Sequence, residues 1–259
     1  MGLFGKMFEK KTCAICGGEI GLLGNRKLED GNMCKKCAAK LSPWFSERRR
    51  STVDSIKEQL AYREANKEKV AEFKPTLTFG TNTKVYLDED DKKFVVTRVD
   101  PRKFEEENPD VIDFSQVTGV DLDIEENMSE DEREDSDGNS VSYNPPRYFY
   151  SYDFNVIIRV NNPYFNEINF RLNSSDVEIN SHGSVPANMK PYPDMNRDYQ
   201  EYKKMGEDIR AALTNARQQV RDEAAAARVP KQAVVCQCCG ASTIPDENGR
   251  CEYCGGAAV

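Results

Sequence analysis

Cysteine is the residue type whose spacing in this chain points most directly to chemistry. Eight of the nine cysteines form four Cys-x-x-Cys pairs, two pairs near each end of the sequence. One such pair can present two thiolates to a single ion, and two pairs complete the tetrahedral shell that zinc prefers. The sequence therefore predicts two Zn²⁺ sites, with the metal ligands Cys13, Cys16, Cys34 and Cys37 in the first site and Cys236, Cys239, Cys251 and Cys254 in the second.

The loops between the paired cysteines agree with this interpretation. Seventeen residues separate the pairs of the first site, which is a usual length for zinc-binding modules. Eleven residues separate the pairs of the second site, which is enough for a small zinc ribbon. Glycine follows three of the four pairs and suits a tight turn around sulfur, because glycine tolerates a positive φ. Four thiolates leave no position for a water molecule, so we expect both ions to be structural.

Other uses of these cysteines are less well supported. Disulfide bonds need an oxidising compartment, and residues 1–8 are too short for a secretion signal. A thioredoxin-like redox pair is disfavoured because each site has two pairs and no βαβ pattern surrounds them. Iron also accepts four thiolates and remains an alternative to zinc. The ninth cysteine, Cys238, stands between two ligands of the second site, and we interpret it as a bystander.

The distribution of charge favours some partners over others. The chain has 259 residues and a formal net charge of −8, and no apolar run approaches the roughly 18 residues of a membrane span. Residues 1–74 hold sixteen Lys/Arg and ten Asp/Glu, whereas the rest holds twenty and thirty-four. The acidic remainder opposes binding to nucleic acid. Nucleic-acid binding stays an alternative because the N-terminal unit is mildly basic. We expect a cytoplasmic protein.

After a leader over residues 1–10, residues 11–74 are expected to form a zinc knuckle followed by a helix. A unit of this size buries little apolar surface, so the metal must supply much of its stability. The residues available for its core are Ile20, Leu22, Leu23 and Leu28.

Apolar residues at helical spacing between Val53 and Phe73 predict a helix over 51–73. Ser42-Pro43 has the form of an N-cap followed by proline at the first helical position, which indicates an earlier helix start. Trp44 and Phe45 are expected to pack the knuckle against the helix.

The run CAICGGEIGLLGNRKLEDGNMCKKCAAKLSPWFS, followed by STVDSIKEQLAYREANKEKV, resembles an uncharacterised bacterial family, a domain of unknown function. Members of that family begin with a four-cysteine knuckle and continue into the same helix. The resemblance covers about residues 10–73, and all four cysteine positions are intact. It implies the ligand positions of the first site and no mechanism, because the family has no known activity.

From residue 75 to about 180 the apolar pattern changes to the period of two that is typical of strands. A stripe of apolar residues from Tyr202 to Val220 then predicts one long helix over about 196–228. This succession, with the segment DVIDFSQVTGVDL, resembles bacterial pleckstrin-homology-like (PH-like) domains over about 75–222. The resemblance implies an assembly or adaptor role. The acidic charge of this region opposes binding of lipid headgroups there.

A strongly acidic stretch interrupts the strands. Between Asp121 and Asp137 there are ten acidic residues and one basic residue, so we expect 121–142 to be a disordered insert. The stretch lacks the ligand spacing of a calcium loop. Aromatic residues between Tyr143 and Tyr152 follow it and are expected to pack on a strand face. The single histidine, His182, has no triad partners around it.

Together these features predict an α+β protein. A small antiparallel β-body closed by a long C-terminal helix, residues 75–228, would lie between the N-terminal knuckle unit and a zinc ribbon over 231–259. We expect a zinc-stabilised adaptor or scaffold that binds a protein partner and has no catalytic activity. The alternative is a nucleic-acid-binding protein that acts through the ribbon or the N-terminal unit.

Overall fold

The computed structural model describes residues 11–180, 183–228, 233–246 and 248–258. The predicted leader over residues 1–10 and His182 lie outside this range. The structure mixes helices and sheets, as the sequence predicts, and it divides into two compact units, Met1–Arg217 and Gln218–Val259. The two units are described separately below.

The first unit begins with two short hairpins that lead into a helix. Strands β1 (Lys11–Thr12) and β2 (Glu19–Ile20) pair, and so do β3 (Asn25–Lys27) and β4 (Asn32–Cys34). Helix α1 (Lys35–Ala38) follows β4 directly. The small core of this knuckle contains the buried side chains of Cys13, Ile20, Leu28, Met33, Cys37, Leu41 and Ile56.

Two of the leucines predicted for this core lie outside it. Leu22 is 84% exposed and Leu23 is 93% exposed, whereas Ile20 and Leu28 are buried. The two leucines occupy the middle of a turn that is closed by a hydrogen bond from the Gly24 N–H to the Gly21 carbonyl. Both side chains project from the tip of this turn into solvent and do not reach the knuckle core.

Helix α2 (Val53–Glu72) lies close to the predicted range of 51–73, and the Thr52 hydroxyl caps its first turn. The predicted helix start at Ser42-Pro43 is wrong, because the first helical turn of this segment is the 3₁₀ helix η2 (Glu47–Arg50). The Ser42 side chain has a different role: it is buried and donates a hydrogen bond to the Asp110 carboxylate at 2.8 Å.

A buried polar network joins α2 to residues 108–111, at the start of the last strand of the first sheet. Arg63 donates to the Asp110 carboxylate at 2.5 Å and to the Asn108 carbonyl. Asn66 donates to the Pro109 carbonyl at 2.7 Å and accepts from the Val111 N–H at 3.0 Å. Apolar spacing along α2 gives no sign of this network, since three residues of its buried face are polar: Gln59, Arg63 and Asn66.

The first sheet has four antiparallel strands in the order β5 (Leu77–Gly80), β6 (Lys84–Asp88), β7 (Lys93–Thr97) and β8 (Val111–Asp113). Short helical turns flank β8: η3 (Pro101–Lys103) and α3 (Phe104–Glu107) precede it, and η4 (Phe114–Gln116) follows it. One face of the sheet packs against the end of α2 and against α3 through Val70, Phe73, Tyr86, Val95, Phe104 and Val111.

The second sheet is organised around one long strand, β10 (Ser140–Val160). Strand β9 (Val117–Glu134) pairs along one edge of β10 over nearly its whole length. The other edge pairs in turn with β11 (Glu167–Arg171), β12 (Val177–Glu178) and β13 (Val185–Pro186). The 3₁₀ turns η5 (Ala187–Met189) and η6 (Pro193–Met195) lead on to the last helix.

The acidic segment 121–142, predicted to be disordered, lies instead in β9, the hairpin turn and β10. Its acidic side chains are spread along two paired strands, where cationic and hydrogen-bond-donating side chains contact some of them. Asp121 pairs with Arg159, and Glu126 receives hydrogen bonds from Tyr152 and Lys190. In the turn, the Asp135 carboxylate accepts two backbone N–H groups, and these hydrogen bonds lower its pKa.

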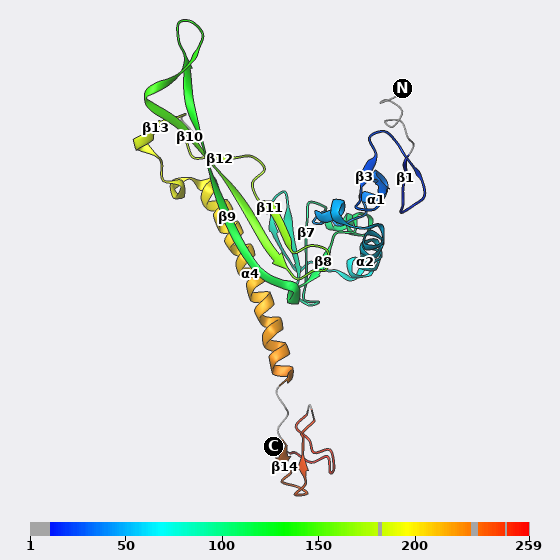
Figure 1. Ribbon diagram of the computed structural model, residues 1–259. Helices are drawn as coiled ribbons and strands as arrows, with labels where there is room; N and C mark the ends of the chain where they lie inside the picture. The colour runs from blue at the N-terminus through cyan, green and yellow to red at the C-terminus, as the bar shows by residue number, and fades with distance from the viewer. Residues whose placement is uncertain (1–10, 181–182, 229–232, 247, 259) are drawn as a thin grey trace. The chain divides into compact units, whose positions relative to one another are not determined.

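Helix α4 (Arg197–Arg228) lies along β9 and β10 in the first unit, and its last residues belong to the second (Figure 1). The Tyr199 ring stands edge-on to Tyr152 and Phe154 at centroid distances of 5.0 and 5.1 Å. Gly206 allows the close approach, because a Cβ atom there would lie 2.4 Å from Leu122 Cδ1. The aromatic residues around Tyr152 therefore serve partly as the packing surface of this helix.

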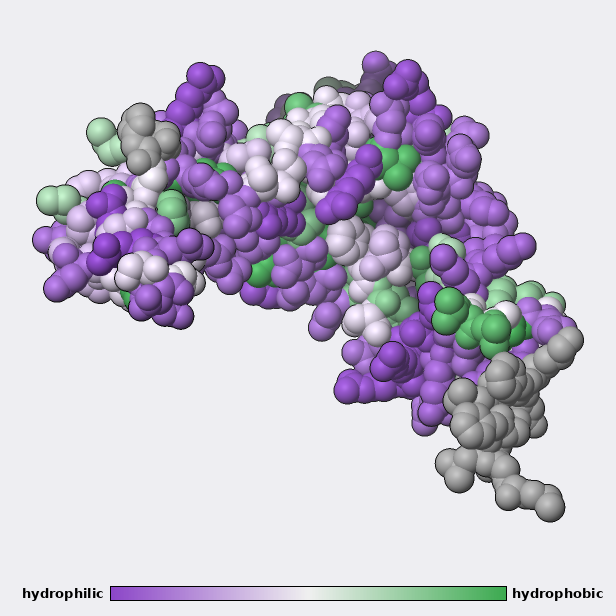
Figure 2. All heavy atoms as spheres, turned by 90° about the horizontal axis from the view of Figure 1, so that it is seen from above, coloured by the Kyte–Doolittle hydropathy of each residue, from purple (hydrophilic) through white to green (hydrophobic). Residues whose placement is uncertain are grey.

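The second unit contains the hairpin of β14 (Val234–Val235) and β15 (Ser242–Thr243). Its core cluster consists of Cys236, Cys251 and Ala258, with Val234 packed against it. None of the helices within the described ranges is long and apolar enough to cross a membrane. Hydrophilic residues cover most of the face drawn in Figure 2, and hydrophobic residues form separate small groups on it.

Candidate metal centres

The first cysteine cluster combines a knuckle turn with the start of a helix. The turn at Cys13 is closed by hydrogen bonds from the Cys13 N–H to the Gly18 carbonyl and from the Gly17 N–H to the Cys13 carbonyl, both 2.8 Å long. Gly17 has a φ of 71°, which glycine adopts without strain. Cys34 ends β4 and is the N-cap of α1, and Cys37 lies within that helix.

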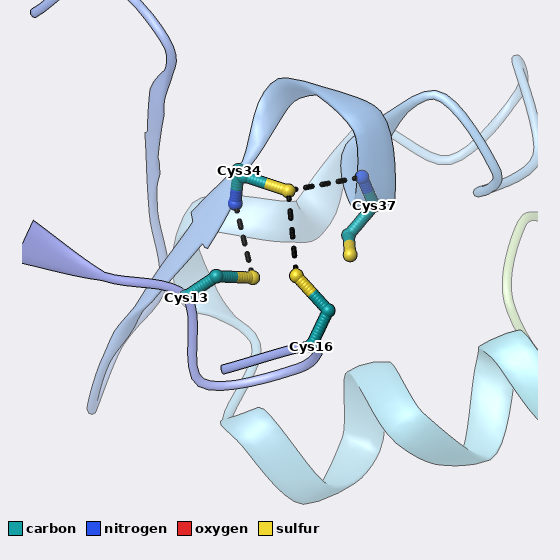
Figure 3. Close-up of side chains that lie close together, drawn as sticks. All are labelled: Cys13, Cys16, Cys34 and Cys37. Atoms are coloured by element: carbon teal, nitrogen blue, oxygen red, sulfur yellow. Dashed lines mark hydrogen bonds between the residues drawn. The ribbon is translucent and has the colours of Figure 1, made fainter. Parts of the chain in front are cut away.

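All four sulfur atoms of this cluster point toward a common space (Figure 3). They lie within 4.8 Å of one another, and the Cys16 and Cys34 sulfurs are 3.8 Å apart. Zinc–sulfur bonds of about 2.3 Å in a tetrahedron place the sulfurs about 3.8 Å apart, so the geometry fits one ion. Backbone N–H groups of Cys34 and Cys37 donate to the sulfurs of Cys13 and Cys34 at 3.2 and 3.4 Å, which stabilises thiolate charge.

The second cluster repeats the knuckle turn twice. The N–H of Cys236 donates to the Ala241 carbonyl and that of Cys251 to the Gly256 carbonyl, each at 2.8 Å. The N–H groups of Gly240 and Gly255 donate to the carbonyls of Cys236 and Cys251. The two glycines have φ values of 75° and 68°. The four sulfurs again lie within 4.8 Å of one another. The Cys236 and Cys254 sulfurs are 3.6 Å apart, and the Cys239 and Cys251 sulfurs are 3.8 Å apart.

The thiols of each cluster respond differently to their surroundings. Burial raises the pKa of Cys13, but backbone hydrogen bonds from Cys16, Cys34 and Ile15 outweigh this and lower it to about 6. Burial and the neighbouring sulfurs raise the pKa of Cys37. A cluster of four thiols therefore ionises only in part unless a cation is present. A divalent ion stabilises all four thiolates, and its loss returns protons to the sulfurs.

The second cluster behaves in the same way. Backbone hydrogen bonds from Cys239 and Cys238 lower the pKa of Cys236 to about 6. The backbone N–H of Gly256 lowers the pKa of Cys254, but the sulfurs of Cys239 and Cys236 outweigh it and raise the value to about 12. Each cluster is thus a set of soft, partly ionised donors that could hold one metal ion. The chemistry such an ion supplies is structural crosslinking, because four sulfurs complete its shell.

The structure brings all eight predicted ligands into two groups and leaves the ninth cysteine out of both. Cys238 is exposed, and it is absent from the second cluster. None of the nine cysteines, all of which lie within the described ranges, forms a disulfide bond. The geometry accommodates zinc and iron alike, because both accept tetrahedral thiolates.

Two further features of the first unit depend on contacts between segments that are distant in the sequence. One is the Arg63–Asp110 pair, whose partners are 47 residues apart in the chain. The other is a group of cationic side chains beside the exposed leucine turn, at Arg26, Lys27, Arg48 and Arg49. The signal available for the second was the run of three arginines from Arg48 to Arg50, which the sequence alone does not bring near residue 26.

Comparison with known proteins adds one match. The family described as "Domain of unknown function (DUF4428)" matches residues 12–59, which include the four cysteines of the first cluster and the start of α2. No curated protein and no solved structure matches the chain. The match agrees with the expected resemblance of the N-terminal unit and supplies no activity for it.

Proposed function

We propose that this protein is a cytoplasmic, zinc-stabilised adaptor that binds a protein partner and catalyses no reaction. Zinc in each of the two clusters would hold the knuckle and the ribbon in shape. The proposal includes the PH-like character of the β-body, which is supported by antiparallel strands followed by a helix that covers one sheet face. The all-thiolate ligand sets support a structural use of the metal, because they provide no open coordination position.

The observation that carries the proposal is the free edge of β9. This strand has 18 residues, and among the described residues it pairs with β10 alone. An edge strand of this length presents backbone N–H and C=O groups to which an extended segment of another protein can add. The edge carries acidic side chains, including the exposed Glu130 and Glu132, so the partner segment that fits it is basic.

The sheet also exposes apolar side chains on both sides of this ribbon. Met128 is 59% exposed and Phe149 is 43% exposed. The paired partner of Met128 is Tyr150, and that of Phe149 is Ser129, so the two residues lie on opposite faces of the hairpin. Successive side chains of an added strand point to opposite faces of the sheet, so they can contact the apolar side chains that this edge exposes on each face.

The test is affinity capture from the native cell with the full chain and two charge-reversal variants. Glu130→Lys/Glu132→Lys changes the free edge, and Glu105→Lys/Glu106→Lys changes another exposed acidic pair, on α3, as a matched control. We expect a defined protein to be captured by the wild type and the α3 variant and lost with the edge variant. Recovery of no protein above background, or of the same proteins by all three forms, would refute the proposal.

A further inference from the structure

The exposed leucine turn and the cations beside it form a second surface of the first unit. Leu22 and Leu23 are among the most exposed large hydrophobic side chains of the described residues, at 84% and 93%. They stand at the tip of the turn closed between Gly21 and Gly24. The turn is small, and β3 starts at the residue after Gly24 and pairs with β4.

Cationic side chains gather beside this turn. The Arg26 guanidinium donates to the Leu23 carbonyl at 3.4 Å and to the Asn25 carbonyl at 3.1 Å, so it is attached to the turn itself. Arg48 of η2 donates to the Lys27 carbonyl at 2.6 Å, which places η2 against β3. Arg49 lines the same hollow, a depression of about 610 Å³ together with Asn25, Arg26, Lys27 and Arg48.

The charges of this hollow are not neutralised from within. Among the described residues, no carboxylate lines it, and none lines the adjoining hollow of about 360 Å³ that contains Arg26, Lys35 and Arg48. Burial lowers the pKa of Arg48, and the positive charges of Arg49 and Arg26 lower it further. Glu47, the acidic residue of η2, is paired with Arg50 at 3.2 Å and lines neither hollow. Like charges held together in this way favour a polyanionic ligand.

Two apolar side chains projecting beyond a cationic base match the cross-section of an acidic bilayer. Leucine gains free energy by entering the acyl boundary, while Lys and Arg remain at the phosphate level. Nucleic acid would use the cations and leave the leucines in water. We propose that the knuckle binds the surface of an anionic lipid membrane, with Leu22 and Leu23 inserted and Arg26, Lys27, Arg48 and Arg49 against lipid phosphates.

This membrane surface is distinct from the β9 edge, so either proposal can fail without the other. The first test is cosedimentation of the full, metal-loaded chain with vesicles of phosphatidylcholine alone and of phosphatidylcholine mixed with phosphatidylglycerol. We expect binding to the acidic vesicles only, with affinity that falls as salt is added. Absence of binding to acidic vesicles at low salt, or equal binding to both kinds, would overturn the proposal.

Substitutions separate the insertion from the charge. Leu22→Ser/Leu23→Ser should weaken binding at least tenfold, since two leucines no longer enter the apolar layer. Its control is Tyr192→Ser/Met195→Ser, which changes side chains that are 82% and 87% exposed elsewhere in the unit. This control should bind like the wild type. A leucine variant that binds like the wild type contradicts the proposal.

Lys27→Ala/Arg49→Ala tests the charges, with an expected loss of roughly fivefold per residue. Lys57→Ala/Lys67→Ala is the control, because these α2 lysines are paired with Asp54 and Glu64. Double-stranded DNA serves as the competing probe. If the chain binds DNA through the charges and not the leucines, and does not bind vesicles, the ligand of this surface is nucleic acid and the membrane proposal fails.

A variant that gains a signal on binding gives a result that misfolding cannot imitate. Leu23→Trp keeps an apolar side chain at the tip of the turn and adds a fluorophore to it. We expect its emission to shift to shorter wavelength with acidic vesicles and to stay unchanged with neutral ones. No shift under conditions where the chain cosediments would show that the turn does not insert.

Discussion

Replacement of Arg63 by methionine should strongly destabilise the first unit. The Arg63 and Asp110 side chains are 8% and 0% exposed, so the substitution leaves a carboxylate inside the protein with Ser42 as its hydrogen-bond donor. Breaking a buried ion pair in this way costs about 3–5 kcal/mol. The carbonyls of Lys40 and Asn108 also lose a donor, at about 1 kcal/mol each.

The size of this loss should depend on pH. Burial raises the pKa of Asp110, and Arg63 and Ser42 offset only part of that rise. A carboxyl with a raised folded-state pKa contributes stability that is fully present below its unfolded value and is lost as pH rises through the folded value. Removal of Arg63 raises the folded value further. The Arg63→Met variant should therefore be closer to the wild type at pH 5 than at pH 8.

The assay is urea unfolding followed by the fluorescence of Trp44, the single tryptophan. Trp44 lines the same cavity of about 700 Å³ as Arg63 and Asp110, so it reports on this part of the first unit. The double variant Arg63→Met/Asp110→Leu removes both charges and should lie only about 3 kcal/mol below the wild type, because the two carbonyls lose a donor and the Ser42 hydroxyl loses its acceptor. A single variant within about 0.5 kcal/mol of the wild type, or a double variant worse than the single, would refute the reasoning.

Three further predictions concern the metal and the helix. Mass spectrometry of the intact protein should find two zinc ions per chain, and one ion or none would contradict the two-site arrangement. A chelator should remove both ions, and circular dichroism should then show a loss of knuckle structure. Cys238→Ser should keep both ions, whereas Cys239→Ser should lose one, and equal metal content would show that Cys238 replaces a ligand. Gly206→Ala should destabilise the first unit by up to about 2 kcal/mol in urea unfolding, because the clash with Leu122 exceeds the helix preference of alanine. Adding Leu122→Ala should remove that clash, and a stabilised Gly206→Ala variant would show that Leu122 gives way freely.

The parts of the fold that local pattern determines were predictable. The eight clustered cysteines follow from spacing, because a Cys-x-x-Cys turn is made within one segment. Helices α2 and α4 follow from apolar periodicity. The acidic hairpin was not predictable from composition. Charge density alone favours disorder, whereas Asp121 and Glu126 are compensated by Arg159 and Lys190, which lie 38 and 64 residues away in the sequence.

Features made by distant segments were missed for the same reason. Leu22 and Leu23 were predicted as core residues because the knuckle has few apolar side chains, and their place at the centre of a turn overrides that preference. The cationic hollow needs Arg26 beside Arg48, and the contact of η2 with β3 that joins them includes a side-chain hydrogen bond from Arg48 to the Lys27 carbonyl. Such contacts have no local signature in the sequence.

The position of the leucine turn explains why a metal would be useful in the knuckle. The turn lies between Cys16 and Cys34, so an ion bound by the first cluster fixes both ends of the segment that carries it. From β4 the chain passes through Cys37 to Ser42, whose hydroxyl reaches Asp110 and thereby the Arg63 network. Loss of the ion would release the turn and the cationic hollow together, while the sheets keep their own core. The metal would thus shape a binding surface without touching the ligand, as closed coordination by four thiolates requires.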